Sequence, residues 1–181
     1  MEANLQVRLR ELYNPIRWIW LALLVEILVL VGIGMLLDYL NVLGGPLFSN
    51  RKVISDLSMM VIVILLFVVL FLKRNLLNPD KLIERAKSKK GDVLNPQWQI
   101  FVHEFGPEAE IMVHVVGIIR KYYLVIWSIG NAIALIGFVA LVLGLPLRQF
   151  MIYAVVGLYS LSVNFPVYSM VERCFYRLKT F

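Results

Sequence analysis

The stretch IRWIWLALLVEILVLVGIGMLLDYL, residues 16–40, decides the fold of this chain. It consists almost wholly of apolar residues, and Glu26 is the one ionisable residue well inside it. Because each residue of an α-helix rises about 1.5 Å, a helix of this length crosses the roughly 30 Å hydrocarbon core of a bilayer. The stretch therefore predicts a membrane-spanning helix with a carboxyl group inside it. An ionised carboxylate without a partner costs on the order of 3 kcal/mol there.

The composition is that of a membrane protein and not of a soluble domain. Apolar residues make up 60% of the 181 residues and charged residues 17%, against roughly 45–50% and 25% in globular domains. The single cysteine, Cys174, excludes an intramolecular disulfide and any cysteine-rich metal or iron–sulfur site. Residues 1–13 carry four charged side chains and lack the apolar region of a signal peptide, so we expect the first span to be an uncleaved signal anchor.

Three further apolar stretches are expected to span the membrane, at residues 53–72, 122–145 and 150–170. The second span has no polar side chain from Met59 onward, so it is the helix most suited to face lipid. Gly-Pro turns end the first and the third span and lead into the return helices. The sequence thus predicts an all-α integral membrane protein: a four-transmembrane-helix bundle of two helical hairpins, with short amphipathic cytoplasmic helices.

The spans divide the chain into five segments. These are an amphipathic N-terminal cytoplasmic segment at 1–15, transmembrane hairpin 1 at 16–74, a cytoplasmic helical connector at 75–120, transmembrane hairpin 2 at 121–171 and a cytoplasmic tail at 172–181. Of the 18 Lys and Arg residues, fifteen lie in or next to the N-terminal segment, the connector and the tail. Since cytoplasmic loops are enriched in Lys and Arg, we expect both termini in the cytoplasm of a plasma or inner membrane. The formal charge of +6 then follows the topology and does not indicate nucleic-acid binding.

The connector combines helix signals with basic residues. Asn78-Pro79 and Asn95-Pro96 each predict a helix start, and the helix that starts at Gly106-Pro107 meets no breaker before the third span. Apolar residues at i, i+3, i+4 and i+7 predict an interfacial amphipathic helix, with Trp98, Phe101, Val102 and Phe105 on its apolar face. The candidates for binding anionic lipid head groups are Arg85, Lys87, Lys89 and Lys90. The positive-inside rule alone would also account for these four residues.

Polar side chains inside three of the spans are the candidate functional residues. Glu26, Asn131 and Asn164 each lie nine or ten residues from a basic residue at the cytoplasmic end of their span, which is a common depth of roughly 14 Å. We expect one intramembrane polar cluster, formed by Glu26, Asn131, Asn164, Ser128 and Ser160. Pro166 is expected to kink the fourth span beside it. The cluster is either a structural clasp, a proton, ion or ligand site in which Glu26 titrates, or a contact of Glu26 with a partner subunit.

No catalytic, cofactor or metal site is expected. The acidic and histidine residues between His103 and His114 do not have the spacing of a metal motif, and Gly106-Pro107 divides them. Cys174 is expected to be inert or palmitoylated. The sequence favours a non-enzymatic subunit that anchors, packs against or assembles a larger membrane complex, with lipids and other membrane subunits of a hetero- or homo-oligomer as partners. The alternative is a channel or transporter subunit that uses Glu26 for proton or ion passage.

Overall fold

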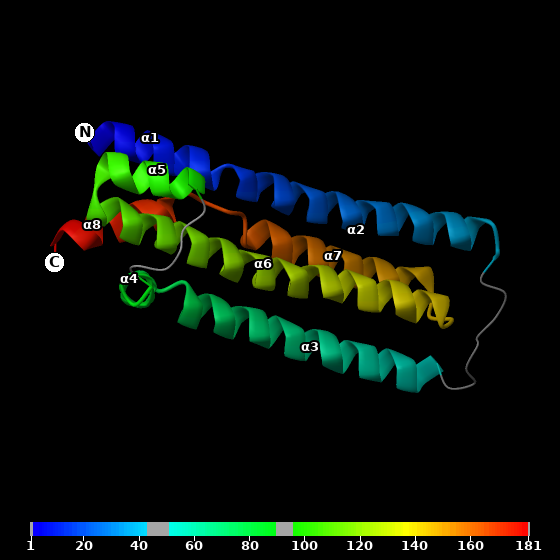
Figure 1. Cartoon of the computed structure of the whole chain (residues 1–181). Helices are drawn as coiled ribbons and strands as arrows, with labels where there is room; N and C mark the ends of the chain where they lie inside the picture. The colour runs from blue at the N-terminus through cyan, green and yellow to red at the C-terminus, as the bar shows by residue number, and fades with distance from the viewer. Residues whose placement is uncertain (1, 43–50, 90–95, 181) are drawn as a thin grey trace. The chain divides into compact units, whose positions relative to one another are not determined.

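A computed structural model describes residues 2–42, 51–89 and 96–180 of the chain (Figure 1). The described residues are 88% helical and include no strand, which confirms the all-α prediction. The helices are α1 (Glu2–Tyr13), α2 (Pro15–Tyr39), α3 (Arg51–Leu76), α4 (Pro79–Lys87), α5 (Pro96–Phe105), α6 (Pro107–Val142), α7 (Leu147–Val163) and α8 (Ser169–Thr180). In this part of the chain, three helical stretches are long and apolar enough to cross a membrane: Val7–Tyr39, Arg51–Leu76 and Glu108–Val142.

Most helix starts follow local signals in the sequence. The side chain of Asn78 accepts a hydrogen bond from the backbone N–H of Asp80 at 3.1 Å, and Pro79 is the first residue of α4. Gly106, with φ of +84°, turns the chain from α5 into α6. The prediction that this helix continues into the third span is confirmed, because α6 runs unbroken for 36 residues. The first Gly-Pro turn, at 44–46, and Asn95 lie outside the described residues.

The fourth apolar stretch differs from its prediction. We expected a span to residue 170 with a kink at Pro166, but α7 ends at Val163 after 17 residues, and a separate α8 follows. Asn164 takes the C-cap position, and Pro166 cannot donate a backbone hydrogen bond to continue the helix. The prediction of one kinked helix is therefore wrong, and α7 is only about 26 Å long.

The described residues form two compact units. Unit 1 comprises Met1–Trp18, Leu72–Leu124 and Pro166–Phe181, and unit 2 comprises Ile19–Phe71 and Val125–Phe165. The long helices α2, α3 and α6 each contribute residues to both units.

Unit 2 is built around the close approach of α6 and α7. A Cβ atom added at Gly157 would lie 2.9 Å from the carbonyl oxygen of Gly130 and 3.3 Å from the Cβ of Ala134, so only glycine fits at this crossing. Trp127 and Ile133 of α6 are fully buried. Small residues at the crossing thus allow the two backbones to meet.

Unit 1 joins the first and last helices of the chain to the connector. Arg177 of α8 forms an ion pair with Asp80 of α4. The rings of Tyr13 and Tyr168 meet edge to face at a centroid distance of 5.7 Å, and the Tyr13 hydroxyl donates to the carbonyl of Val167 at 3.4 Å. The N-terminal segment, the connector and the tail therefore pack together within this unit.

Candidate intramembrane polar site

The structure brings Glu26 and Asn131 together within unit 2. Asn131 Nδ2, on α6, donates a hydrogen bond of 2.7 Å to Glu26 Oε2, on α2. Asn131 is buried, with 6% of its surface exposed, whereas Glu26 is exposed. A hydrogen bond to a carboxylate is stronger than one between neutral groups when the carboxylate is ionised. The pair therefore ties α2 to α6 within unit 2.

Asn164 and Ser160 have other partners. Asn164 Nδ2 donates to the carbonyl of Ser160 at 2.7 Å, and the carbonyl of Asn164 accepts from Trp127 Nε1 at 2.8 Å. These bonds satisfy backbone groups at the end of α7 and attach that end to α6. Ser128, the fifth predicted member, is exposed on α6.

Three buried oxygen atoms next to these bonds have unused hydrogen-bonding capacity. Among the described residues, Asn131 Oδ1, Ser160 Oγ and Asn164 Oδ1 have no hydrogen-bond partner. Ser160 Oγ lies 3.3 Å from the Cβ position of Gly130, the residue before Asn131, so two of the three atoms come from adjoining parts of α6 and α7. An unsatisfied buried polar atom costs roughly 1–3 kcal/mol. These oxygens are chemically suited to accept a hydrogen bond or to bind a hard cation.

Glu26 also belongs to an uncovered face of α2. Val29 and Ile33, one and two turns further along that face, are apolar and exposed, and so are the nearby Val25 and Leu36. In the most apolar 18-residue window of the stretch Val7–Tyr39, only 11% of the residues are buried inside the protein. In the corresponding window of Glu108–Val142, which contains most of α6, 50% are buried. A carboxyl group therefore lies at the edge of a broad apolar surface.

A second polar cluster in unit 2 was missed by the sequence reasoning. Gln149 Nε2 donates to Ser55 Oγ at 2.5 Å and to Tyr153 Oη at 2.8 Å, and the hydroxyls of Ser58 and Tyr153 are 3.1 Å apart. These bonds join α3 to α7. The i, i+4 spacing of Gln149 and Tyr153, together with the i, i+3 spacing of the two serines, was the signal that could have revealed it.

The predicted lipid-binding residues are in different surroundings. The guanidinium of Arg85 lies over the ring of Tyr122, 5.6 Å from its centroid, and donates a hydrogen bond to its hydroxyl. Lys87 and Lys89 are exposed, and Lys90 lies outside the described residues. Arg85 is therefore occupied by an intramolecular contact.

Helix α5 turns its predicted apolar residues toward the protein. Phe101 is buried, Trp98, Val102 and Phe105 are half-buried, and His103 and Glu104 are exposed. The rings of Phe101 and Phe105 lie 5.0 Å apart.

Cys174 packs inside unit 1 and is fully buried. Burial raises the pKa of its thiol to about 11. Because the thiolate is the reactive form, burial and the raised pKa both disfavour reaction of this thiol at neutral pH, and the choice between an inert and a palmitoylated Cys174 stays a prediction.

The chain matches no protein-family model, no curated protein and no solved structure.

Proposed function

We propose that the chain is a non-enzymatic, polytopic membrane subunit that anchors, packs against or assembles a larger membrane protein complex. The observation that carries this proposal is the exposed Glu26 on the apolar face of α2. Lipid would cover the apolar residues of that face at no cost, but a charged group facing lipid costs on the order of 3 kcal/mol. A protein partner that donates a hydrogen bond to the free oxygen of Glu26 removes this cost.

The proposed topology has four spans in two hairpins, with both termini and the amphipathic connector helices in the cytoplasm of a plasma or inner membrane. Unit 1 supports it, because Arg177 of the tail pairs with Asp80 of the connector, and Tyr13 of the N-terminal segment contacts Tyr168. Polar segments outside the spans that pack against one another lie on the same side of the membrane. A chain that begins and ends on the same side crosses an even number of times, so α7 serves as the fourth span despite its length.

Co-purification tests the proposal. The tagged chain is extracted from its native membrane in a mild detergent, and the bound proteins are identified by mass spectrometry. We expect integral membrane proteins to co-purify with the wild type and with Glu26→Gln, since an amide still forms hydrogen bonds, and to be lost with Glu26→Leu. Purification of the folded wild-type chain alone as a monomer would contradict the proposal.

A channel or transporter subunit is the second candidate. Asn131, which bonds to Glu26, has an unpartnered buried oxygen, and so do Ser160 and Asn164 of the same unit; these atoms favour it, because hard cations and protons bind to oxygen ligands of this kind. In reconstituted vesicles this function predicts a proton or cation flux that Glu26→Gln abolishes while the protein stays folded. The absence of flux in wild-type vesicles would eliminate it.

A further inference from the structure

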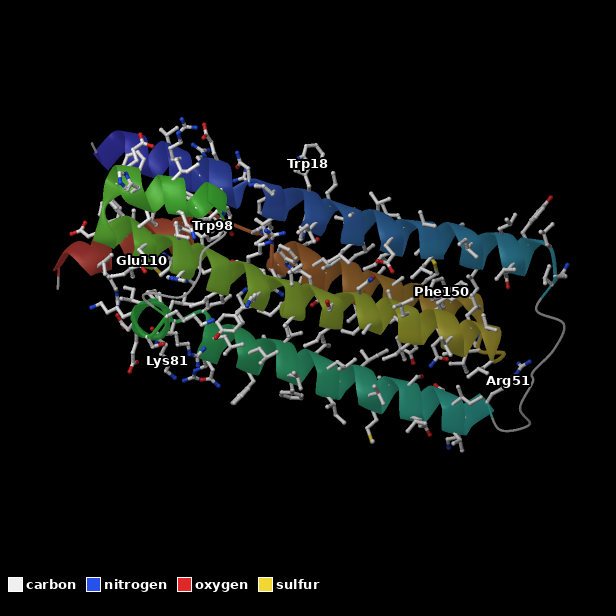
Figure 2. The ribbon with its side chains drawn as sticks, in the orientation of Figure 1. Trp18, Arg51, Lys81, Trp98, Glu110 and Phe150 are labelled. Carbon is white, nitrogen blue, oxygen red and sulfur yellow. The ribbon has the colours of Figure 1, made fainter. Side chains whose placement is uncertain are left out.

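Unit 1 contains a small pocket that the proposed function does not use. Its volume is about 90 Å³, which is room for roughly three water molecules. It is lined by Lys89 after α4, Trp98 of α5, and Val113, His114, Gly117, Ile118 and Lys121 of α6. Figure 2 shows Trp98 between α5 and α6. Four lining residues carry nitrogen donors, namely Lys89, Trp98, His114 and Lys121, and none of the described lining residues is acidic.

The sequence of α6 builds one wall of this pocket. His114, Gly117, Ile118 and Lys121 follow one another at i, i+3, i+4 and i+7, so they share one face of the helix. Gly117 has no side chain there, and a Cβ atom at its position would lie 3.8 Å from the Trp98 ring. The indole ring of Trp98 therefore lies over the space next to Gly117 and forms one side of the pocket.

Three of the donor groups of the pocket, on Lys89, His114 and Lys121, have no carboxylate beside them among the described lining residues. Among the described residues, His114 Nε2 is buried and has no hydrogen-bond partner. Lys89 and Lys121 are exposed, and each ammonium has three donors and no acceptor. Glu110 lies one turn before His114 but does not line the pocket. A group with several oxygen acceptors and a negative charge would satisfy all three side chains.

We propose that this pocket binds the phosphate of an anionic phospholipid head group. Its volume suits one phosphate-sized group, and basic pockets between helices on the cytoplasmic side recognise such head groups. Lys121 directly precedes the apolar stretch of α6, and tryptophan is enriched at membrane interfaces, so the pocket is at the depth of lipid head groups. A soluble phosphate ester offers the same chemistry, but the interfacial position favours a lipid. The inference goes beyond the proposed function, because a subunit of a complex requires no lipid site.

Native mass spectrometry of the full chain in a neutral detergent tests the proposal. The protein is titrated with dioleoylphosphatidylglycerol or with zwitterionic dioleoylphosphatidylcholine, and bound lipids are counted. We expect one phosphatidylglycerol to bind in preference to phosphatidylcholine. Lys89→Gln/Lys121→Gln should weaken its apparent affinity by about tenfold or more, since each lysine near a head group contributes about 1 kcal/mol.

The matched control is Lys52→Gln/Lys81→Gln, which removes the same charge from exposed positions of α3 and α4 outside the pocket. It should change the affinity by less than about threefold, because a neutral detergent has no surface potential for diffuse attraction. His114→Phe keeps a ring of similar volume and removes its nitrogens, so it should also weaken binding if its unfolding temperature is unchanged. The lysine variants decide the question if His114→Phe does not fold.

Two results would overturn the assignment. Equal losses in the two lysine pairs would show that the basic residues act by diffuse charge and not through a pocket. Glycerol 3-phosphate binding as tightly as phosphatidylglycerol, with the same loss in Lys89→Gln/Lys121→Gln, would assign the pocket to a soluble phosphate ester and not to a lipid.

Discussion

At the scale of single residues, two of the polar side chains that the sequence places at one depth form a hydrogen bond, and a third bonds to its own helix. Glu26 and Asn131 each lie well inside a long helix, and their side chains meet. Asn164 was counted along a helix that ends at Val163, and there its side chain bonds to the backbone of its own helix. Depth arguments therefore hold only as far as the helix continues. Whether the predicted cluster is functional stays a prediction.

The Glu26–Asn131 hydrogen bond predicts a measurable coupling between the two side chains. Glu26→Gln should change the free energy of unfolding by no more than about 0.6 kcal/mol, the average for interhelical hydrogen bonds in membranes. Glu26→Leu leaves Asn131 Nδ2 buried without a partner and should cost about 1–3 kcal/mol. A double-mutant cycle with Asn131→Leu, measured by reversible unfolding in mixed micelles, should show non-additivity. Strict additivity would mean that the two side chains do not interact.

Cys174 predicts a pH-dependent loss of stability. The pKa of its thiol in the folded protein, about 11, is above the usual value of 9.0 for a cysteine thiol. The protonated form is thus favoured by folding, so the stabilisation is complete below pH 9 and is lost as the pH rises through 11. Cys174→Ser should remove this part of the pH dependence. At pH 8 a maleimide should label native Cys174 much more slowly than the unfolded chain, and equal labelling rates would contradict its burial.

At the scale of the helices, local signals predicted where elements begin better than where they end. Caps and prolines act within one turn, so the starts of α2, α4 and α6 could be predicted from Pro15, Asn78 and Gly106-Pro107. The end of α7 depends on Pro166, which is a local signal, and also on a bond to another part of unit 2. Trp127 of α6, far away in the sequence, donates to the carbonyl of Asn164 there. No pattern within residues 147–166 contains that contact.

Two glycine-to-alanine substitutions, one at the α6–α7 crossing and one on α2, are expected to have opposite effects on stability. Gly157→Ala would place its Cβ 2.9 Å from a backbone oxygen of Gly130, which cannot move aside cheaply, so we expect a loss of about 1–3 kcal/mol. Gly32→Ala meets nothing within 4 Å and should be neutral or stabilise by up to about 1 kcal/mol. Thermal unfolding in detergent compares the two variants. A tolerated Gly157→Ala would mean that the helices are further apart.

At the scale of the whole molecule, composition and the length of the apolar stretches predicted an all-helical chain with membrane-spanning helices. The pairing of α4 with α8 and the Ser55–Gln149 contact were not predictable, because each joins residues more than ninety positions apart by polar groups that carry no periodic signal. The number of spans stays a prediction, and the Arg177–Asp80 ion pair supports the proposed four-span topology because it joins the tail to the connector.

Side-specific labelling tests the proposed topology. Lys52→Cys and Ser88→Cys are both exposed positions, one at the start of α3 and one after α4. In intact cells a membrane-impermeant maleimide should label Lys52→Cys at once and Ser88→Cys only after the membrane is permeabilised. Labelling of both positions from the same side would contradict the assignment of α3 as a span.

We propose that a membrane protein partner covers the face of α2 that carries Glu26. Val29, one turn from Glu26 on that face, and Phe67 of α3 are both exposed and apolar, at 53% and 68%. A photo-crosslinking amino acid at each position, activated in native membranes, compares them directly. We expect a specific protein adduct at Val29, and Glu26→Leu should weaken it. At Phe67 we expect only lipid adducts. Lipid adducts alone at Val29 would contradict it.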